Sequence, residues 1–117
     1  MTGYLTTHVL DTARGRPARG MRVELWRLDG EKRERLAETV TNDDGRTDAH
    51  ILPAERFATG SYELVFHVGD WLDAEQFEAE DPRFLDQVPL RFGMSEAAHY
   101  HVPLLISPFG YSTYRGS

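Results

Sequence analysis

Residues 99–117 read HYHVPLLISPFGYSTYRGS, and this stretch decides which fold the sequence can adopt. Two apolar runs, rich in residues that favour strands, are joined by the turn-forming residues 107–110 (SPFG). The second run reaches Tyr114 and would carry the end of the chain into a sheet, where it is held instead of fraying. The stretch therefore predicts two neighbouring strands that fix the polar residues 114–117 in place.

The two histidines of this stretch, His99 and His101, are two residues apart. Side chains two apart on a strand share one face, so both imidazoles would lie on the same side of the sheet. The side chains that alternate with them and face the other way are Tyr100, Val102 and Leu104. The pattern thus separates a hydrophobic core from titratable groups on the opposite face.

The rest of the chain contains β-prone runs separated by turn signals. We expect further strands at about residues 4–11, 21–28, 35–41, 61–68 and 85–92. The acidic segment 71–80 predicts one short helix, which Asp81-Pro82 would end, and residues 54–58 could form a short helical turn. About seven or eight short strands with frequent turns indicate an all-β, antiparallel β-sandwich instead of a parallel sheet.

The composition of the 117 residues limits the class of protein. Residues 1–117 fit a single domain, and 40% hydrophobic residues suffice for a core. The formal net charge of -6 argues against nucleic-acid binding, which depends on clustered positive charge. No signal peptide is visible, and no run approaches the roughly 18 apolar residues of a membrane span, so we expect a cytoplasmic protein without a membrane partner.

A metal site is also disfavoured by the sequence. The chain has no cysteine, which removes disulfides, thiolate chemistry and cysteine metal ligands together. His99 and His101 could bind zinc with a third histidine, but no closely spaced ligand pair with supporting hydrogen-bond partners is present. We therefore expect no bound metal.

Histidine is the usual general base near neutral pH, and the chain has five. A single histidine on a strand is most often solvated or hydrogen-bonded, and we apply this interpretation to His50 and His67. His8 is harder to dismiss, because it follows two threonines in a segment without a strong apolar face. The candidates for proton transfer are therefore His8 and the pair in residues 99–101.

Arg46 follows the turn Asn-Asp-Asp-Gly at residues 42–45. Its guanidinium could bind an anion or a polarised carbonyl, or it could simply lie on the surface. The terminal residues 114–117 are open to the same two interpretations. The residues alone predict only a β-sandwich with polar groups at one end of the chain.

Seven short segments, spread over nearly the whole chain, form a recognisable set. They are 5–11 (LTTHVLD), 23–25 (VEL), 42–47 (NDDGRT), 62–64 (YEL), 84–85 (FL), 100–105 (YHVPLL) and 111–117 (YSTYRGS). Together they resemble the 5-hydroxyisourate hydrolases, the transthyretin-related enzymes of urate breakdown. The ending Tyr-Arg-Gly-Ser, combined with the Thr-His-Val-Leu-Asp start, separates these enzymes from the hormone-carrying transthyretins, whereas residues 70–83 match least well.

The resemblance implies a transthyretin-like (prealbumin-like) sandwich of two four-stranded sheets with one short helix. It also implies a homotetramer, assembled as a dimer of dimers with sites in the channel between them. The positions that match catalytic residues of the family are His8, Arg46, His101 and Ser117. The positions that match substrate-binding residues are His8, Arg46, Tyr114, Arg115 and Gly116. His99 ranks below His101, because its counterpart in the family varies.

The implied reaction is hydrolysis of 5-hydroxyisourate to 2-oxo-4-hydroxy-4-carboxy-5-ureidoimidazoline. It requires an activated water and donors placed where negative charge develops. Either His8 or His101 would take the proton of the water while the other orients it, and Arg46 would stabilise the oxyanion or grip a substrate carbonyl. These groups suffice without a cofactor, and the sequence leaves open which histidine is the base.

Two other functions fit a sandwich of this kind. A transthyretin-like carrier would bind a small aromatic ligand without chemistry and would have no need of a proton-transfer pair. An immunoglobulin-like interaction module would be monomeric, and its exposed histidines would have no role.

Overall fold

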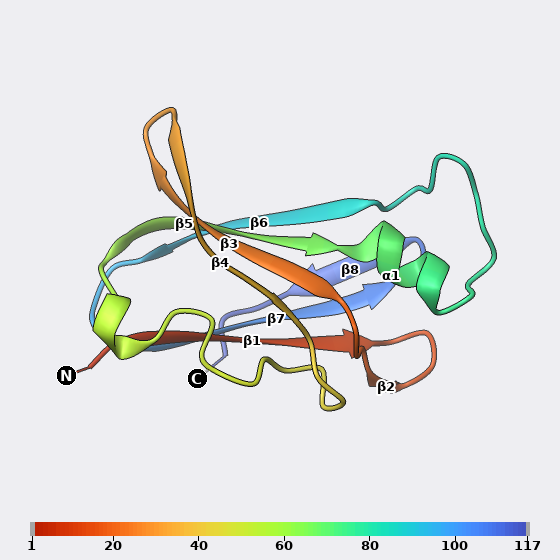
Figure 1. Ribbon diagram of the computed structural model, residues 1–117, viewed down its shortest axis with the longest axis horizontal. Coiled ribbons are helices and arrows are strands. Elements are labelled where there is room, and N and C mark those ends of the chain that lie inside the picture. Colours follow the sequence, from red (N-terminus) through yellow and green to blue (C-terminus); the bar gives the residue numbers. More distant parts are fainter. Residues whose placement is uncertain (1, 117) are drawn as a thin grey trace.

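The computed structural model describes residues 2–116, which form two four-stranded β-sheets packed face to face (Figure 1). The first sheet has the order β2-β1-β7-β8, with bounds Arg16–Pro17, Tyr4–Asp11, His99–Ser107 and Gly110–Thr113. The second has the order β4-β3-β5-β6, with bounds Lys32–Val40, Arg22–Asp29, Gly60–His67 and Gln87–Met94. The predicted sandwich of two four-stranded sheets is therefore confirmed.

One strand pair departs from the antiparallel pattern. β1 and β7 run parallel, with Thr6 opposite His101 and Leu10 opposite Leu105, whereas the other pairs in residues 2–116 are antiparallel. β1 and β7 are not joined by a hairpin, which would force antiparallel pairing, so the two strands are free to pair in parallel. β2 is a two-residue strand in a segment where no strand was expected.

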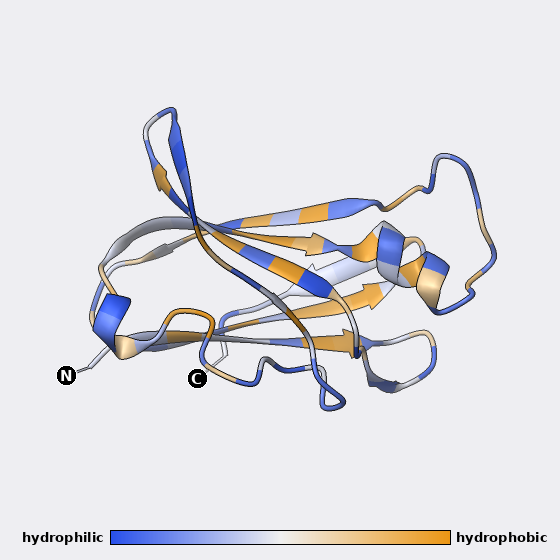
Figure 2. Ribbon diagram, viewed as in Figure 1, coloured by the Kyte–Doolittle hydropathy of each residue, from blue (hydrophilic) through white to orange (hydrophobic). Residues whose placement is uncertain are grey.

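The core lies between the sheets and follows the alternation along the strands. β1 alternates strictly between half-buried and buried residues, and Leu5, Thr7 and Val9 point inward. Hydrophobic and hydrophilic residues also alternate along the ribbon of β3 (Figure 2). Residues 4–11 show no strong apolar face in the sequence because the polar residue Thr7 occupies a core position. Its hydroxyl donates to the Val102 carbonyl at 2.8 Å.

The helix differs from the expected segment 71–80. α1 spans Val68–Ala74 and begins directly where β5 ends, because Trp71 and Leu72 are buried against the sandwich. It ends early because Gln76 adopts a positive φ of 63°. The Gln76 and Phe77 amides then donate to the carbonyls of Asp73 and Leu72, which is the Schellman pattern that closes a helix.

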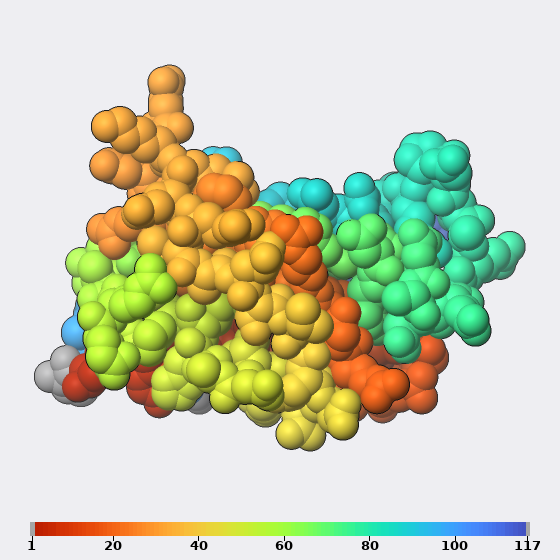
Figure 3. Space-filling model, in the orientation of Figure 1, coloured from red at the N-terminus to blue at the C-terminus, as the bar shows by residue number. Residues whose placement is uncertain are grey.

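The shape beyond the sandwich is set by short connections. A single 3₁₀ turn, η1 (Ala54–Arg56), confirms the helical turn expected near residue 54. The turn between β3 and β4 and the loop after α1 extend outward at two corners of the space-filling view (Figure 3). Among the described residues, neither helix has the length and apolar character needed to cross a lipid bilayer.

Candidate functional site

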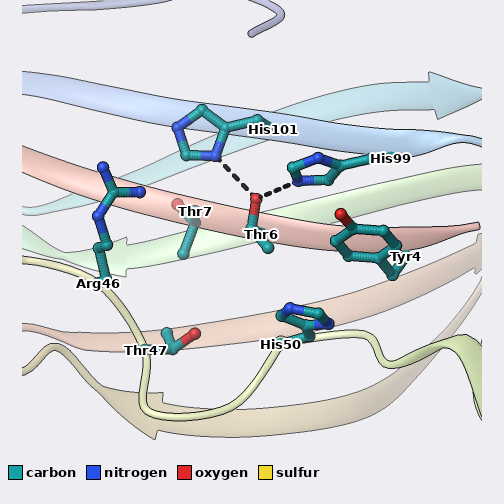
Figure 4. A pocket seen from close by; sticks show the side chains of 8 residues that line it. All are labelled: Tyr4, Thr6, Thr7, Arg46, Thr47, His50, His99 and His101. Carbon is teal, nitrogen blue, oxygen red and sulfur yellow. Dashed lines mark hydrogen bonds between the residues drawn. The ribbon is translucent and has the colours of Figure 1, made fainter. Parts of the chain in front are cut away.

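The candidate site lies on the face of the first sheet that points away from the core. A cavity of about 450 Å³ opens there (Figure 4), lined by Tyr4, Thr6, Thr7, Arg46, Thr47, His50, His99 and His101. Strands β1 and β7 supply most of these side chains, because their parallel register places Tyr4 opposite His99 and Thr6 opposite His101. The outward positions of two neighbouring strands therefore gather several polar side chains at one place.

The turn at residues 42–46 brings Arg46 to the edge of β1. The Asn42 side-chain oxygen accepts the amides of Asp44 and Arg46 at 2.9 and 3.1 Å, which fixes the turn. Gly45 has a φ of 73° and contacts the backbone of Val9, whose amide donates to the Gly45 carbonyl at 2.8 Å. The result is an isolated bridge that sets Arg46 opposite His8.

The turn also fixes the tautomer of His8. Its Nε2 atom lies 2.9 Å from the carbonyl oxygen of Asp44. A carbonyl oxygen can only accept, so Nε2 carries the hydrogen and the lone pair of the neutral ring is on Nδ1. His8 therefore presents Nδ1 as its basic atom.

His101 is held from two sides. Its Nδ1 lies 2.8 Å from the Thr6 hydroxyl, and its carbonyl accepts the Gly116 amide at 2.7 Å. Gly116 packs against the imidazole so closely that a Cβ there would lie 2.7 Å from the Cδ2 atom of His101. In Figure 4 the other ring nitrogen of His101 is on the side of Arg46. The ring centroids of His8 and His101 are 6.4 Å apart.

The surroundings of both imidazoles favour the neutral form of the ring. Burial, and then the positive charge of Arg46, lowers the pKa of His8. The pKa of His101 is lowered by burial, by Arg46 and by the neighbouring rings of His8 and His99. A neutral imidazole can accept a proton at neutral pH, so the site holds two potential general bases beside one guanidinium.

The match of a family model now places the chain among known proteins. The model described as "HIUase/Transthyretin family" matches residues 5–116. The chain belongs to this family.

Individual relatives agree with this assignment. The 5-hydroxyisourate hydrolase of Mesorhizobium japonicum is 60% identical, over 98% of this chain and 93% of its own. The solved structure of Klebsiella pneumoniae 5-hydroxyisourate hydrolase is 37% identical, with a TM-score of 0.81 over 98% of this chain and 94% of its own. A crystal structure of (S)-allantoin synthase is 45% identical, with a TM-score of 0.92 over 99% of this chain, and this chain spans 44% of that protein.

The structure brings together three of the residues that the family resemblance singled out: His8, Arg46 and His101. Gly116 joins them through its bridge to His101. Ser117 lies outside the described residues. The remaining two, Tyr114 and Arg115, line a second cavity of about 310 Å³ between β6, β7 and β8.

Arg115 faces away from the first cavity because of its contact with β7. Its guanidinium lies 4.3 Å from the ring centroid of Tyr100. Tyr100 alternates with His101 and is buried, so Arg115 packs on the opposite face of the strand from the imidazole. Within one chain, Arg115 does not reach the cavity of His101.

Five of the eight lining residues were not singled out from the sequence: Tyr4, Thr6, Thr7, Thr47 and His50. Tyr4 stacks between His50 and His99, with ring centroids 4.4 and 4.1 Å apart, and Thr6 bonds two imidazoles. His50 is exposed, as expected for a solvated side chain, and it also lines the cavity. Only the parallel register of β1 and β7 could have revealed this grouping, and the sequence carries no signal for that register.

His67 fits the interpretation given to it. It is buried, its Nε2 lies 2.5 Å from the carboxylate of Glu24, and it does not line the cavity. Among residues 2–116, no three His, Cys, Asp or Glu side chains are grouped closely enough to hold a metal ion.

Proposed function

We propose that this protein hydrolyses 5-hydroxyisourate to 2-oxo-4-hydroxy-4-carboxy-5-ureidoimidazoline, a step of urate degradation. The observation that carries the proposal is the grouping of two imidazoles with lowered pKa and one guanidinium: Arg46 and His101 line the cavity, and His8 lies beside both of them. The 60% identity to a 5-hydroxyisourate hydrolase over nearly the full length supports it. A carrier of the transthyretin type would have no use for paired bases beside a cation.

The proposed chemistry needs only side chains. One imidazole takes a proton from water as the oxygen attacks the carbonyl carbon of the six-membered ring. The carbonyl oxygen becomes negative, and Arg46 stabilises this charge or holds a neighbouring carbonyl. The carbon–nitrogen bond then breaks, and the protonated imidazole returns its proton to the leaving nitrogen. The carboxylic acid that remains loses its proton to solvent and becomes a carboxylate.

The chain end is proposed to help bind the ring. Gly116 touches His101, which supports a role for the terminal segment in shaping the cavity. We assign Tyr114, Arg115 and Ser117 to substrate binding or catalysis on the basis of the family resemblance. Arg115 and Tyr114 line the second cavity, so their part in the site would require movement of the tail or a neighbouring subunit.

We also infer a cytoplasmic homotetramer, assembled as a dimer of dimers. The cavity is open on the outward face of the first sheet, so a second copy placed over this face would enclose it. Half-buried Leu10 and Leu105 lie opposite each other in the register of that sheet, beside the polar cavity. Contact with another subunit would remove the remaining apolar surface of this pair from water.

The test is a spectroscopic assay with 5-hydroxyisourate produced in situ by urate oxidase. The protein should remove the compound faster than it decays spontaneously, and decay at the spontaneous rate would overturn the proposal. His8→Ala and Arg46→Ala should each lower turnover by ~100-fold or more, the usual scale for such groups. Arg16→Ala, which removes an exposed arginine from β2, is the matched control and should keep full activity.

A further inference from the structure

The polar outward side chains of β1 and β7 include one contact that the proposed hydrolysis does not use. The Thr6 hydroxyl lies 2.8 Å from Nδ1 of His101 and 2.8 Å from Nε2 of His99 (Figure 4). We propose that His101, Thr6 and His99 form a proton relay that moves the proton taken from water away from the reacting centre. The inference rests on the proposed function, and it assigns the role of base to His101.

The relay is possible because the Thr6 hydroxyl has one hydrogen to donate and can also accept a hydrogen bond. Thr6 can donate to one imidazole nitrogen and must accept from the other. If it donates to His99, it accepts from Nδ1–H of His101, and Nε2 of His101 is left as the basic atom. If it donates to His101 instead, Nε2 of that ring carries the hydrogen and cannot act as a base. The tautomer of His99 therefore sets the tautomer of His101.

The proton path balances in both directions. Nε2 of His101 takes a proton from water, Nδ1–H passes its proton to the Thr6 oxygen, and Thr6 passes its own to Nε2 of His99. His101 is then neutral with a hydrogen on Nε2, and His99 carries the positive charge. When His101 gives its Nε2 proton to the leaving ring nitrogen, the two transfers reverse and all three groups return to their first state.

The charges around the relay favour this direction. Burial and the positive charge of Arg46 both oppose a proton on His101, and they therefore lower its pKa. Arg46 and His99 lie on opposite sides of Thr6 in Figure 4, so the relay moves the charge away from the guanidinium. At His99 the ring is stacked on Tyr4 with an interplanar angle of 8°, and an aromatic face attracts a cation.

The other face of Tyr4 limits where the charge can go. It is stacked against His50, at an angle of 17°. Tyr4 thus separates His50 from His99, and the Thr6 hydroxyl connects His99 to His101. The cavity holds one relay, with His99 as its outer member.

The main test uses Thr6→Val, which keeps the shape and the strand preference of threonine but removes the hydroxyl. We expect kcat to fall by ~10- to 100-fold with KM nearly unchanged, since the loss affects proton transfer and not binding. Thr6→Ser is the matched control, because it keeps a hydroxyl, and it should restore kcat to within ~3-fold. Circular dichroism and light scattering would verify that fold and assembly are kept.

His99→Phe tests the outer end of the relay. The phenyl ring can keep the stack on Tyr4 but cannot accept a proton, so kcat should fall as in Thr6→Val. The double variant should be no slower than either single one, because both changes interrupt the same path. In mixtures of light and heavy water, a plot of kcat against the fraction of heavy water should be curved for the unchanged protein, in which several protons move together. The plot should be linear for Thr6→Val, in which a single proton moves.

Each outcome decides the matter. Full kcat in Thr6→Val, an equal loss in Thr6→Ser, or additive losses in the double variant would overturn the relay and leave a merely structural contact. Failure of the proposed function would look different, because the unchanged protein would then give no turnover at all. ¹⁵N resonances of His101 give a readout without substrate: His99→Phe should shift its tautomer balance, and unchanged shifts would contradict the coupling.

Discussion

Burial and the charge of Arg46 act in the same direction on His8 and His101, and both lower the pKa of the imidazole. The neutral, basic form should therefore persist below the ordinary histidine pKa of about 6.5. We expect kcat/KM to stay level from neutral pH down to that value and to decline only as pH falls through the lowered pKa. A pH–rate profile measured against the spontaneous decay of the substrate would check this.

Arg46→Ala separates the two causes. It removes the charge but not the burial, so the pKa of both imidazoles should rise, and NMR titration can follow this even where turnover is low. Arg16→Ala should leave both titrations unchanged. If the titrations of His8 and His101 were the same in Arg46→Ala as in the unchanged protein, the guanidinium would not control their charge.

At the scale of elements, the turn at residues 42–46 couples stability to the site. Gly45 has a φ of 73°, and a Cβ there would also collide with the carbonyl oxygen of Val9. We expect Gly45→Ala to lower the free energy of unfolding by about 2–4 kcal/mol, the sum of backbone strain and displacement of the turn from β1. Turnover should fall as well, because the turn positions Arg46.

Gly30→Ala is the control for backbone strain alone. Gly30 has a φ of 62°, but nothing lies within 4 Å of the position of a Cβ. Its cost should be about 1 kcal/mol and should leave turnover unchanged. Urea denaturation of both variants gives the comparison. Equal costs would mean that the contact between Gly45 and Val9 does not hold the turn.

The elements also divide into those that the sequence could predict and those that it could not. The faces of β7 were predictable, because alternation places His101 opposite Tyr100 and Val102. The end of α1 was not, because Gln76 closes it in a conformation that glycine usually adopts. The parallel contact of β1 with β7 joins segments more than ninety residues apart, and no local pattern encodes such a register.

The residues of the candidate site could not be grouped from local sequence patterns either. His8, Arg46 and His101 were indicated by resemblance to known enzymes, since their spacing along the chain says nothing of their proximity. Thr6 was overlooked because a threonine on a strand is ordinary, and its importance depends on the two imidazoles that the fold places around it. Chemistry that depends on long-range pairing becomes visible only in the folded chain.

At the scale of the whole molecule, the open cavity predicts that assembly and activity depend on one another. Leu105 is half-buried on the outward face of β7, next to Leu10, and is well placed for contact with another copy. Leu105→Glu would bury an unpaired carboxylate in the proposed subunit contact, which is costly, and should divide the proposed tetramer into smaller species. Light scattering should give about four times 13.4 kDa for the unchanged protein and a smaller mass for the variant.

Turnover should fall together with the mass, because a cavity that the proposed neighbouring subunit no longer covers admits bulk water. Val40→Glu is the matched control, because it also replaces an apolar side chain by a carboxylate. Val40 is exposed and lies on β4 in the other sheet, so this variant should keep both mass and turnover. Normal circular dichroism in Leu105→Glu would show that the subunit still folds. Full turnover by a monomer would contradict the idea that the site is completed between subunits, and it would restrict catalysis to the residues that one chain brings together.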